Sequence, residues 1–243
     1  MSDLTRALEF MAWVENRCST RVDVWRWGEA VFNDDFPKVF DFNFLRVDGV
    51  PEDLDFEELI DEAERLHSDA GHGHRKIVID DEILGRALQL RFQSQGWEPA
   101  ALLVMVYRGG EATPSSGEAV REISLFELRE VRAAAFGAGP IGRDPEAMRQ
   151  LLDKDAVYVE AGNGRFIAAL VDGRPVCSAD LYSDGSTAQI EGVLTLEPYR
   201  KRGLATAVVN AAVATALAEG HDFVFLIADQ EDWPKEMYAR LGF

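Results

Sequence analysis

The sequence predicts an α/β protein in which mixed, mostly antiparallel sheets are flanked by helices, arranged as two similar units in tandem. Strands and helices alternate along the chain, and the dipeptides Asp172-Gly173 and Asp184-Gly185 are hairpin signals between three strands. The order strand, helix, strand, helix, Gly-aromatic occurs twice, over 39–97 and 187–243. We interpret this order as an internal duplication. The alternative is that two α/β segments share it by chance.

The first half is predicted to open with a helix over residues 4–16, because Leu4, Leu8 and Met11 recur at helical spacing. Residues 53–67 show similar spacing within an acidic, amphipathic stretch, which also predicts a helix. The other elements expected here are a helix over 82–94 and strands over 25–32, 39–47, 75–80 and 101–107.

A segment rich in glycine, proline and serine, residues 109–117, is the clearest linker in the chain. It divides the protein into an expected N-terminal domain over 1–108 and a C-terminal domain over 118–243. Within the second domain we expect helices over 126–136, 145–152 and 204–219, and strands over 120–125, 157–160, 166–171, 176–182, 188–196 and 221–227.

The charge of the chain limits its partners. It carries 43 acidic and 25 basic residues, a net charge of -18 in 243 residues. Such a charge repels a phosphate backbone and argues against nucleic acid as a partner. It suits a cationic partner, although an acidic surface also serves solubility alone. No segment reads as a signal peptide or a membrane span, so we expect a cytoplasmic protein without membrane contact.

Neither cysteine nor histidine spacing predicts a metal site. Cys18 and Cys177 lack metal-ligand spacing and are expected as small buried hydrophobic residues. His67, His72 and His74 lie in and around a turn before a strand, where we expect a solvated loop rather than a ligand set.

The most informative stretch is a tight basic turn. Arg200, Lys201 and Arg202 run directly into Gly203 and an apolar helix. The start of a helix exposes unpaired N–H groups and partial positive charge, and a glycine lets the backbone approach an anion closely. The turn therefore predicts a phosphate site. The alternative is that residues 200–205 are only a helix start.

Two familiar nucleotide-binding motifs are excluded at this turn. It has no G-x-x-x-x-G-K-[ST], and its single glycine is too few for a dinucleotide fingerprint. Residues 137–142 satisfy G-x-G-x-x-G literally, but they follow a helix and contain Pro140. We interpret that segment as a helix C-cap and loop.

The basic turn matches R-x-x-G-x-A, and residues 233–243 end in Y-A-R-L-G-F. In this order, over residues 118–243, the two motifs resemble the acetyl-CoA-binding motif and the later L-Y-x-x-x-G-F helix of the GNAT family of N-acetyltransferases. The resemblance implies a GNAT fold, acetyl-CoA as co-substrate without a metal, and acetyl transfer to an amine.

The same resemblance implies which residues hold acetyl-CoA. The backbone of a strand would pair with the pantetheine arm like an added strand and offer an N–H group to the thioester oxygen, through Val193, Leu194 and Thr195. The pyrophosphate would be held by the basic turn, through Arg200, Lys201, Arg202, Gly203, Leu204 and Ala205.

Acetyl transfer needs a neutral amine and a proton for the departing thiolate. Tyr238 stands at the family's general-acid position, or only packs there. By strand alternation one face carries Gln189, Glu191, Val193 and Thr195. The resemblance gives an acidic side chain on this strand the role of base, which makes Glu191 the candidate. The alternative is that Glu191 binds a cationic substrate.

The chain departs from the family pattern in two places. The asparagine upstream of the tyrosine is absent, and Glu231, Asp232 and Trp233 occupy that region. The chain also ends at Gly242-Phe243, where the family usually continues into another strand, so either the strand is missing or another segment covers the sheet edge. The N-terminal half has the acidic loop 48–53 in place of the basic turn, which predicts a degenerate unit.

We therefore expect an acetyl-CoA-dependent N-acetyltransferase in which a primary amine attacks directly, without a covalent enzyme intermediate. The acceptor is a small molecule or peptide, and the acidic run Asp229, Glu231 and Asp232 suggests a cationic one. The alternative is a non-catalytic acyl-CoA-binding sensor or regulatory module. A monomer and a homodimer both remain open.

Overall fold

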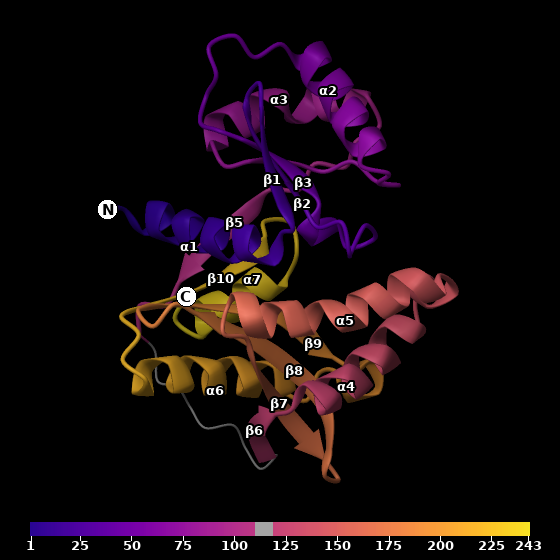
Figure 1. Ribbon diagram of the computed structural model, residues 1–243. Helices are drawn as coiled ribbons and strands as arrows, with labels where there is room; N and C mark the ends of the chain where they lie inside the picture. Colours follow the sequence, from indigo (N-terminus) through magenta and orange to yellow (C-terminus); the bar gives the residue numbers. More distant parts are fainter. Residues whose placement is uncertain (110–118) are drawn as a thin grey trace. The chain divides into compact units, whose positions relative to one another are not determined.

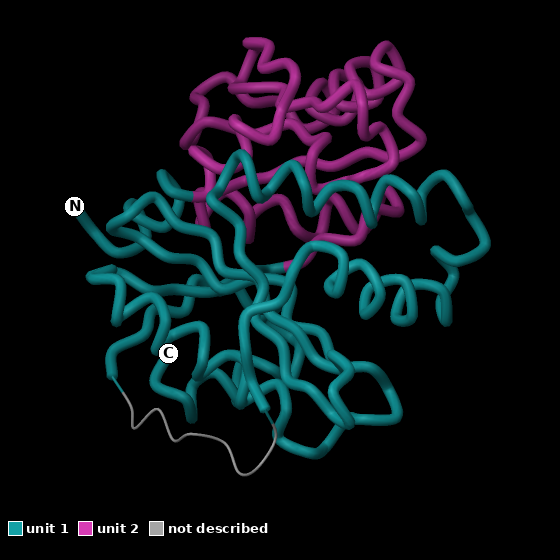
Figure 2. Tube along the Cα trace, turned by 60° about the horizontal axis from the view of Figure 1, so that its bottom comes forward, with its two compact units in different colours: residues 1–10, 101–243 teal, residues 11–100 magenta. Residues whose placement is uncertain are grey.

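The computed structural model describes residues 1–109 and 119–243, which form two compact units (Figures 1 and 2). The smaller unit comprises residues 11–100, and the larger unit comprises residues 1–10 and 101–243. One sheet has four strands and the other has six. The predicted class, an α/β protein with mixed sheets flanked by helices, is confirmed.

The smaller unit has the strand order β1-β2-β3-β4, and only the β3/β4 pair is parallel. Its elements are the C-terminal part of α1 (Asp3–Cys18), then β1 (Arg21–Trp25), β2 (Gly28–Phe32), η1 (Phe40–Phe42), β3 (Phe44–Val47), α2 (Phe56–Asp69), β4 (Ile77–Ile79) and α3 (Glu82–Ser94). The single strand expected over 25–32 is wrong, because Trp25 pairs with Gly28 across a hairpin turn.

Helix α2 shows how this unit forms its core. The carboxylate of Asp55 accepts hydrogen bonds from the N–H groups of Glu57 and Glu58, at 2.9 and 3.0 Å, and so begins the helix. The buried face carries Phe56 and Leu59 at helical spacing. Phe92 of α3 packs edge to face on Phe56, with ring centroids 5.1 Å apart.

Two histidines of the smaller unit, His67 and His72, are buried, and His74 is half-buried. His67 is fully buried, His72 is 5% exposed, and their Nδ1 atoms lie 3.0 Å apart. His74 Nε2 lies 3.0 Å from the carbonyl oxygen of Asn43. The solvated loop expected for these residues is therefore wrong, because the His67 and His72 side chains pack against each other and against the Phe32 ring. Lost hydration lowers the pKa of His67 and of His72 to about 4.

The larger unit has the strand order β5-β10-β9-β8-β7-β6, in which only the β9/β10 pair is parallel. Its strands are β5 (Leu102–Val106), β6 (Ala119–Ile123), β7 (Arg165–Val171), β8 (Arg174–Ser183), β9 (Thr187–Thr195) and β10 (Phe223–Asp229). Its helical elements are α4 (Leu125–Gly137), η2 (Pro140–Arg143), α5 (Pro145–Ala161), η3 (Glu197–Tyr199), α6 (Leu204–Ala218) and α7 (Pro234–Arg240).

Helices cover both faces of the six-stranded sheet. Ile167 and Ala169 of β7 belong to the cluster that packs against α6. Phe166 and Ala168 point to the opposite face, because successive strand residues alternate, and they pack against Leu128 of α4. Nearly every side of α6 is apolar, which suits a helix buried along a sheet.

The sheet gains its outermost strand from an unexpected part of the chain. Residues 101–108 were expected in the N-terminal domain, but β5 pairs antiparallel with β10, with Val106 opposite Phe225. This pairing covers the edge that the chain's last strand would otherwise expose. The linker expected over 109–117 lies, apart from Gly109, outside the described residues. The functional division of the chain stays a prediction.

Helix α5 corrects another expectation. The strand predicted over 157–160 is the last part of this helix, which runs to Ala161. Asp144 begins the helix, and its carboxylate accepts hydrogen bonds from the N–H groups of Glu146 and Ala147. The apolar residues near its end stay helical because Tyr158 packs on Tyr182 of β8, with ring centroids 4.7 Å apart.

The two sheets repeat one pattern of strand directions. Strands β1 to β4 pair antiparallel, antiparallel and parallel, and strands β7 to β10 do the same. A helix joins the parallel pair in each, α2 in the smaller unit and α6 in the larger. This agreement is consistent with tandem units, and the duplication itself stays a prediction.

The buried histidines predict that mild acid destabilises the smaller unit. Unfolded histidine has a pKa near 6.5, so between about pH 6.5 and pH 4 the unfolded state binds more protons than the folded state. The free energy of unfolding should therefore fall as the pH falls through this range. Thermal unfolding followed by circular dichroism should show a smaller loss of Tm between about pH 7.5 and pH 5 in His72→Phe than in the parent. Equal losses would contradict this role.

Candidate active site

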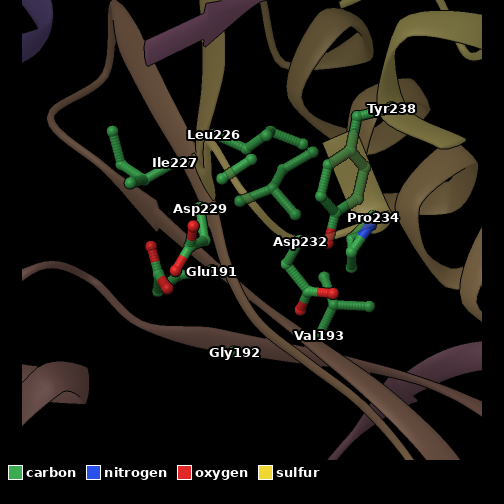
Figure 3. Close-up of a pocket in the computed structure, with 11 residues that line it drawn as sticks. Glu191, Gly192, Val193, Leu226, Ile227, Asp229, Asp232, Pro234 and Tyr238 are labelled. Carbon is green, nitrogen blue, oxygen red and sulfur yellow. The ribbon is translucent and has the colours of Figure 1, made fainter. Parts of the chain in front are cut away.

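A pocket opens where two strands of the larger unit separate (Figure 3). Strands β9 and β10 pair in parallel only from Thr187–Phe223 to Ile190–Leu226. Beyond that point β9 continues beside β8, and β10 continues beside β5. The opening encloses a cavity of about 240 Å³. Its walls come from β9, β10, α7 and the loop before α7.

The lining brings together residues that are far apart in the sequence. Glu191 comes from β9, Asp229 ends β10, Asp232 lies in the loop that follows, and Tyr238 comes from α7. In Figure 3 the Tyr238 hydroxyl points toward the side where Asp232 lies, and Glu191 lies beside Asp229 in the view. The apolar part of the wall is made by Ile190, Val193, Leu226, Ile227, Ala228 and Pro234. The pocket is therefore acidic, with one phenol.

Tyr238 keeps its proton at neutral pH. The side chain is 8% exposed, and the chain end packs over it, with the Phe243 ring 6.2 Å away. Burial is the main cause that raises the pKa of Tyr238 to about 12, and the negative charges of Glu191 and Asp232 add to it. The phenol is therefore a hydrogen-bond and proton donor throughout the ordinary pH range.

Glu191 lies at the point where β9 leaves the regular sheet pattern. Gln189 donates a hydrogen bond to its carboxylate, with Nε2 and Oε2 3.0 Å apart. The register of β8 and β9 shifts by one residue between the pairs Ser178–Leu194 and Asp180–Glu191, which is a β-bulge. The bulge lies at Gly192, whose φ is +59°.

This bulge overturns one expectation about β9. Strand alternation predicted that Gln189, Glu191, Val193 and Thr195 share one face, but the extra residue moves the last two to the other face. Val193 packs with the cluster around α6, and the Thr195 hydroxyl donates to Cys177 Sγ at 3.1 Å. Of the three backbone positions expected to hold acetyl-CoA on β9, Val193 lines the pocket. Leu194 and Thr195 continue the strand beyond it.

The basic turn has a left-handed backbone at two positions and leads directly into α6. Lys201 and Gly203 have φ values of +62° and +76°, and α6 begins at Leu204 without a side-chain N-cap. Arg200, Lys201 and Arg202 are exposed. Within residues 1–109 and 119–243, neither Arg200 nor Lys201 forms an ion pair. The site therefore combines exposed cations with the start of a fifteen-residue helix.

Sequence reasoning missed a buried charged network beneath the bulge. Arg132 of α4 pairs with Asp155 of α5 and with Asp180 of β8, and all three side chains are at most 4% exposed. One signal was available, since a glycine within a strand pattern indicates a bulge or a close approach of another group. Gly192 is that glycine. The partners of Arg132 had no local signal, because they lie 23 and 48 residues away in the sequence.

Among the residues that the structure describes, no group of three or more His, Cys, Asp or Glu side chains is arranged to hold a metal ion. In the same part of the chain, no helix combines the length and apolar character needed to cross a membrane.

Comparison with known proteins gives a family match for part of the larger unit. Residues 125–243 match the family model described as the acetyltransferase (GNAT) family. No curated protein matches the chain. Among solved structures, a conserved protein of unknown function from Staphylococcus epidermidis is 18% identical with a TM-score of 0.69, covering 92% of this chain and 89% of its own. At this identity the likeness shows a shared fold.

Two other structures are similar over about half of the chain. A putative GNAT acetyltransferase from Novosphingobium aromaticivorans is 21% identical with a TM-score of 0.42, over 59% of this chain and 58% of its own. An aminoglycoside acetyltransferase from an uncultured soil metagenomic sample is 22% identical with a TM-score of 0.41, over 52% of this chain and 91% of its own. By the family match, residues 125–243 of this chain form an acetyltransferase domain of the GNAT family.

Proposed function

We propose that this protein moves an acetyl group from acetyl-CoA to a primary amine of a small molecule or peptide, in the pocket between β9 and β10. The observation that carries the proposal is that the pocket joins a carboxylate, Glu191, and a buried phenol, Tyr238. Direct attack of an amine on a thioester uses these two groups, one to accept a proton and one to donate one.

The co-substrate is proposed to lie along β9 and across the start of α6. Past Ile190 the backbone of β9 is no longer paired with β10. The stretch Val193, Leu194 and Thr195 can therefore pair with the pantetheine arm as an added strand. The exposed cations of residues 200–202 and the backbone amides at the start of α6 suit the pyrophosphate.

Two side chains, those of Glu191 and Tyr238, assist the proposed reaction. Glu191 takes a proton from the attacking amine, and the N–H group of Val193 donates to the oxygen that becomes negative. The C–N bond forms and the C–S bond breaks while Tyr238 donates a hydrogen bond to the departing sulfur. CoA leaves as the thiolate, and Glu191 releases the proton it took from the amine to solvent. No bond to the protein forms.

The raised pKa of Tyr238 limits what it does. An ordinary thiol has a pKa of about 8.5, so complete transfer from a phenol with a pKa of about 12 is uphill by roughly 5 kcal/mol. Tyr238 therefore acts mainly as a hydrogen-bond donor to the sulfur while the C–S bond breaks. It is always available for this role, because burial keeps it protonated.

The acceptor is proposed to be cationic. Three carboxylates, those of Glu191, Asp229 and Asp232, line the pocket, and among the described residues no basic side chain does so. An ammonium group is attracted to such a pocket and must lose one proton before it attacks. A compound with a second positive charge would keep one ammonium for binding while the other amine reacts.

A first test concerns the basic turn. Gly203→Glu adds a carboxylate where the pyrophosphate is proposed to bind, so calorimetric titration should show acetyl-CoA binding weakened by about tenfold or more. Gly220→Glu is the matched control at the other end of α6. Both glycines have positive φ, and an added Cβ meets no atom within 4 Å at either. Equal binding by the two variants would contradict the proposed pyrophosphate site.

A second test concerns Tyr238. Tyr238→Phe keeps the ring but removes the donor, so kcat should fall by about 10²-fold or more while acetyl-CoA affinity changes little. Tyr107→Phe, which removes a phenol packed on the same Phe243, is the control and should keep the parent kcat. Unchanged turnover in Tyr238→Phe would rule out Tyr238 as the donor to the departing sulfur. A parent that binds acetyl-CoA but acetylates no amine would favour the sensor alternative.

A third test separates the two roles open to Glu191. If it is the base, Glu191→Gln should lower kcat, and the residual rate should rise with pH as the free amine increases. If it only binds a cationic acceptor, KM for the amine should rise with kcat unchanged. Steady-state kinetics with one amine over a range of pH distinguish these outcomes.

A further inference from the structure

A buried charged network joins the helices α4 and α5 to the strand beside the pocket. Arg132 Nη2 lies 2.5 Å from Asp180 Oδ2, and Arg132 Nη1 pairs with Asp155. The Tyr182 hydroxyl donates to the same Asp180 oxygen at 3.0 Å. The side chains of Arg132, Asp155 and Asp180 are 4%, 1% and 2% exposed. Burying such charges opposes folding, and apolar residues would often serve stability as well.

The network lies directly under the bulge of β9. A Cβ on Gly192 would lie 2.7 Å from Asp180 Oδ2 and 3.0 Å from Arg132 Nη2. The charged pair therefore occupies the space that a side chain at 192 would fill. Asp180 is also the register partner of Glu191, so the two carboxylates face the same side of the sheet. Arg132 supplies the positive charge that offsets their repulsion.

We propose that Arg132 is a positioning residue: with Asp155 it holds Asp180 against Gly192, and this contact maintains the bulge that directs Glu191 and the Val193 N–H group into the pocket. The effect of the bulge on turnover rests on the proposed function, whereas the bulge itself does not. Through this network, side chains of α4 and α5 are in contact with the strand that carries the proposed thioester site.

The bulge can be tested without any ligand. In Asp180→Ala, the amide protons of residues 191–195 should exchange with solvent at least about tenfold faster than in the parent, as measured by NMR on the full chain. The amides of β7 should exchange at the parent rate. Asp180→Asn, which keeps the shape and can still accept from Arg132, should have a smaller effect.

A matched control removes another arginine from the same sheet. Arg165 of β7 pairs with Glu122 and Glu219 but lies away from the bulge. Arg165→Gln should leave exchange at residues 191–195 unchanged. Parent-like exchange there in Asp180→Ala would overturn the proposal. So would faster exchange spread evenly over the sheet, because that is the result of a general loss of stability.

The same variants separate this inference from the proposed function. If the parent acetylates an amine, Asp180→Ala should lower kcat about tenfold or more and change the acetyl-CoA Kd by less than about threefold. If the parent acetylates nothing, the proposed function fails, and the exchange experiment still decides about the bulge. Should Asp180→Ala not fold, Gly192→Ala places a methyl group against the same pair. Parent-like amide exchange in folded Gly192→Ala would overturn the proposal.

Discussion

The site of the larger unit depends on one constraint: two parallel strands begin as hydrogen-bonded neighbours and then separate. The pairing of β9 with β10 ends at Ile190 and Leu226, and a bulge at Gly192 immediately follows on β9. Each strand keeps a second partner, β8 or β5, so the separation leaves neither unsupported. This geometry is what allows an interior pocket in a continuous sheet.

The charge distribution combines an acidic protein and an acidic pocket with one basic turn. The chain carries a net charge of -18, and the pocket lining is acidic, yet the turn before α6 presents three cations in succession. An acidic protein would repel an anionic co-substrate unless it had a local cationic anchor. The helix start and the positive-φ residues Lys201 and Gly203 add oriented backbone amides to that anchor.

Local features of the site were readable from the sequence, and features that depend on distant pairing were not. The basic turn and Tyr238 belong to short contiguous motifs, so their neighbourhood is given by the residues beside them. The bulge at Gly192 was not predicted. Because its extra residue reverses strand alternation, Val193 and Thr195 were predicted on the wrong face. The pairing of β5 with β10 was not predicted, because the two strands lie more than a hundred residues apart in the chain.

The most direct test of the account is a product analysis with the parent protein, acetyl-CoA and a set of mono- and polyamines, read by mass spectrometry. Direct attack in the pocket predicts that at least one amine, most readily one with two or more positive charges, gains an acetyl group while the mass of the protein stays unchanged. A protein that binds acetyl-CoA and leaves every amine unmodified would contradict the account. So would a protein that becomes acetylated before it acetylates the amine.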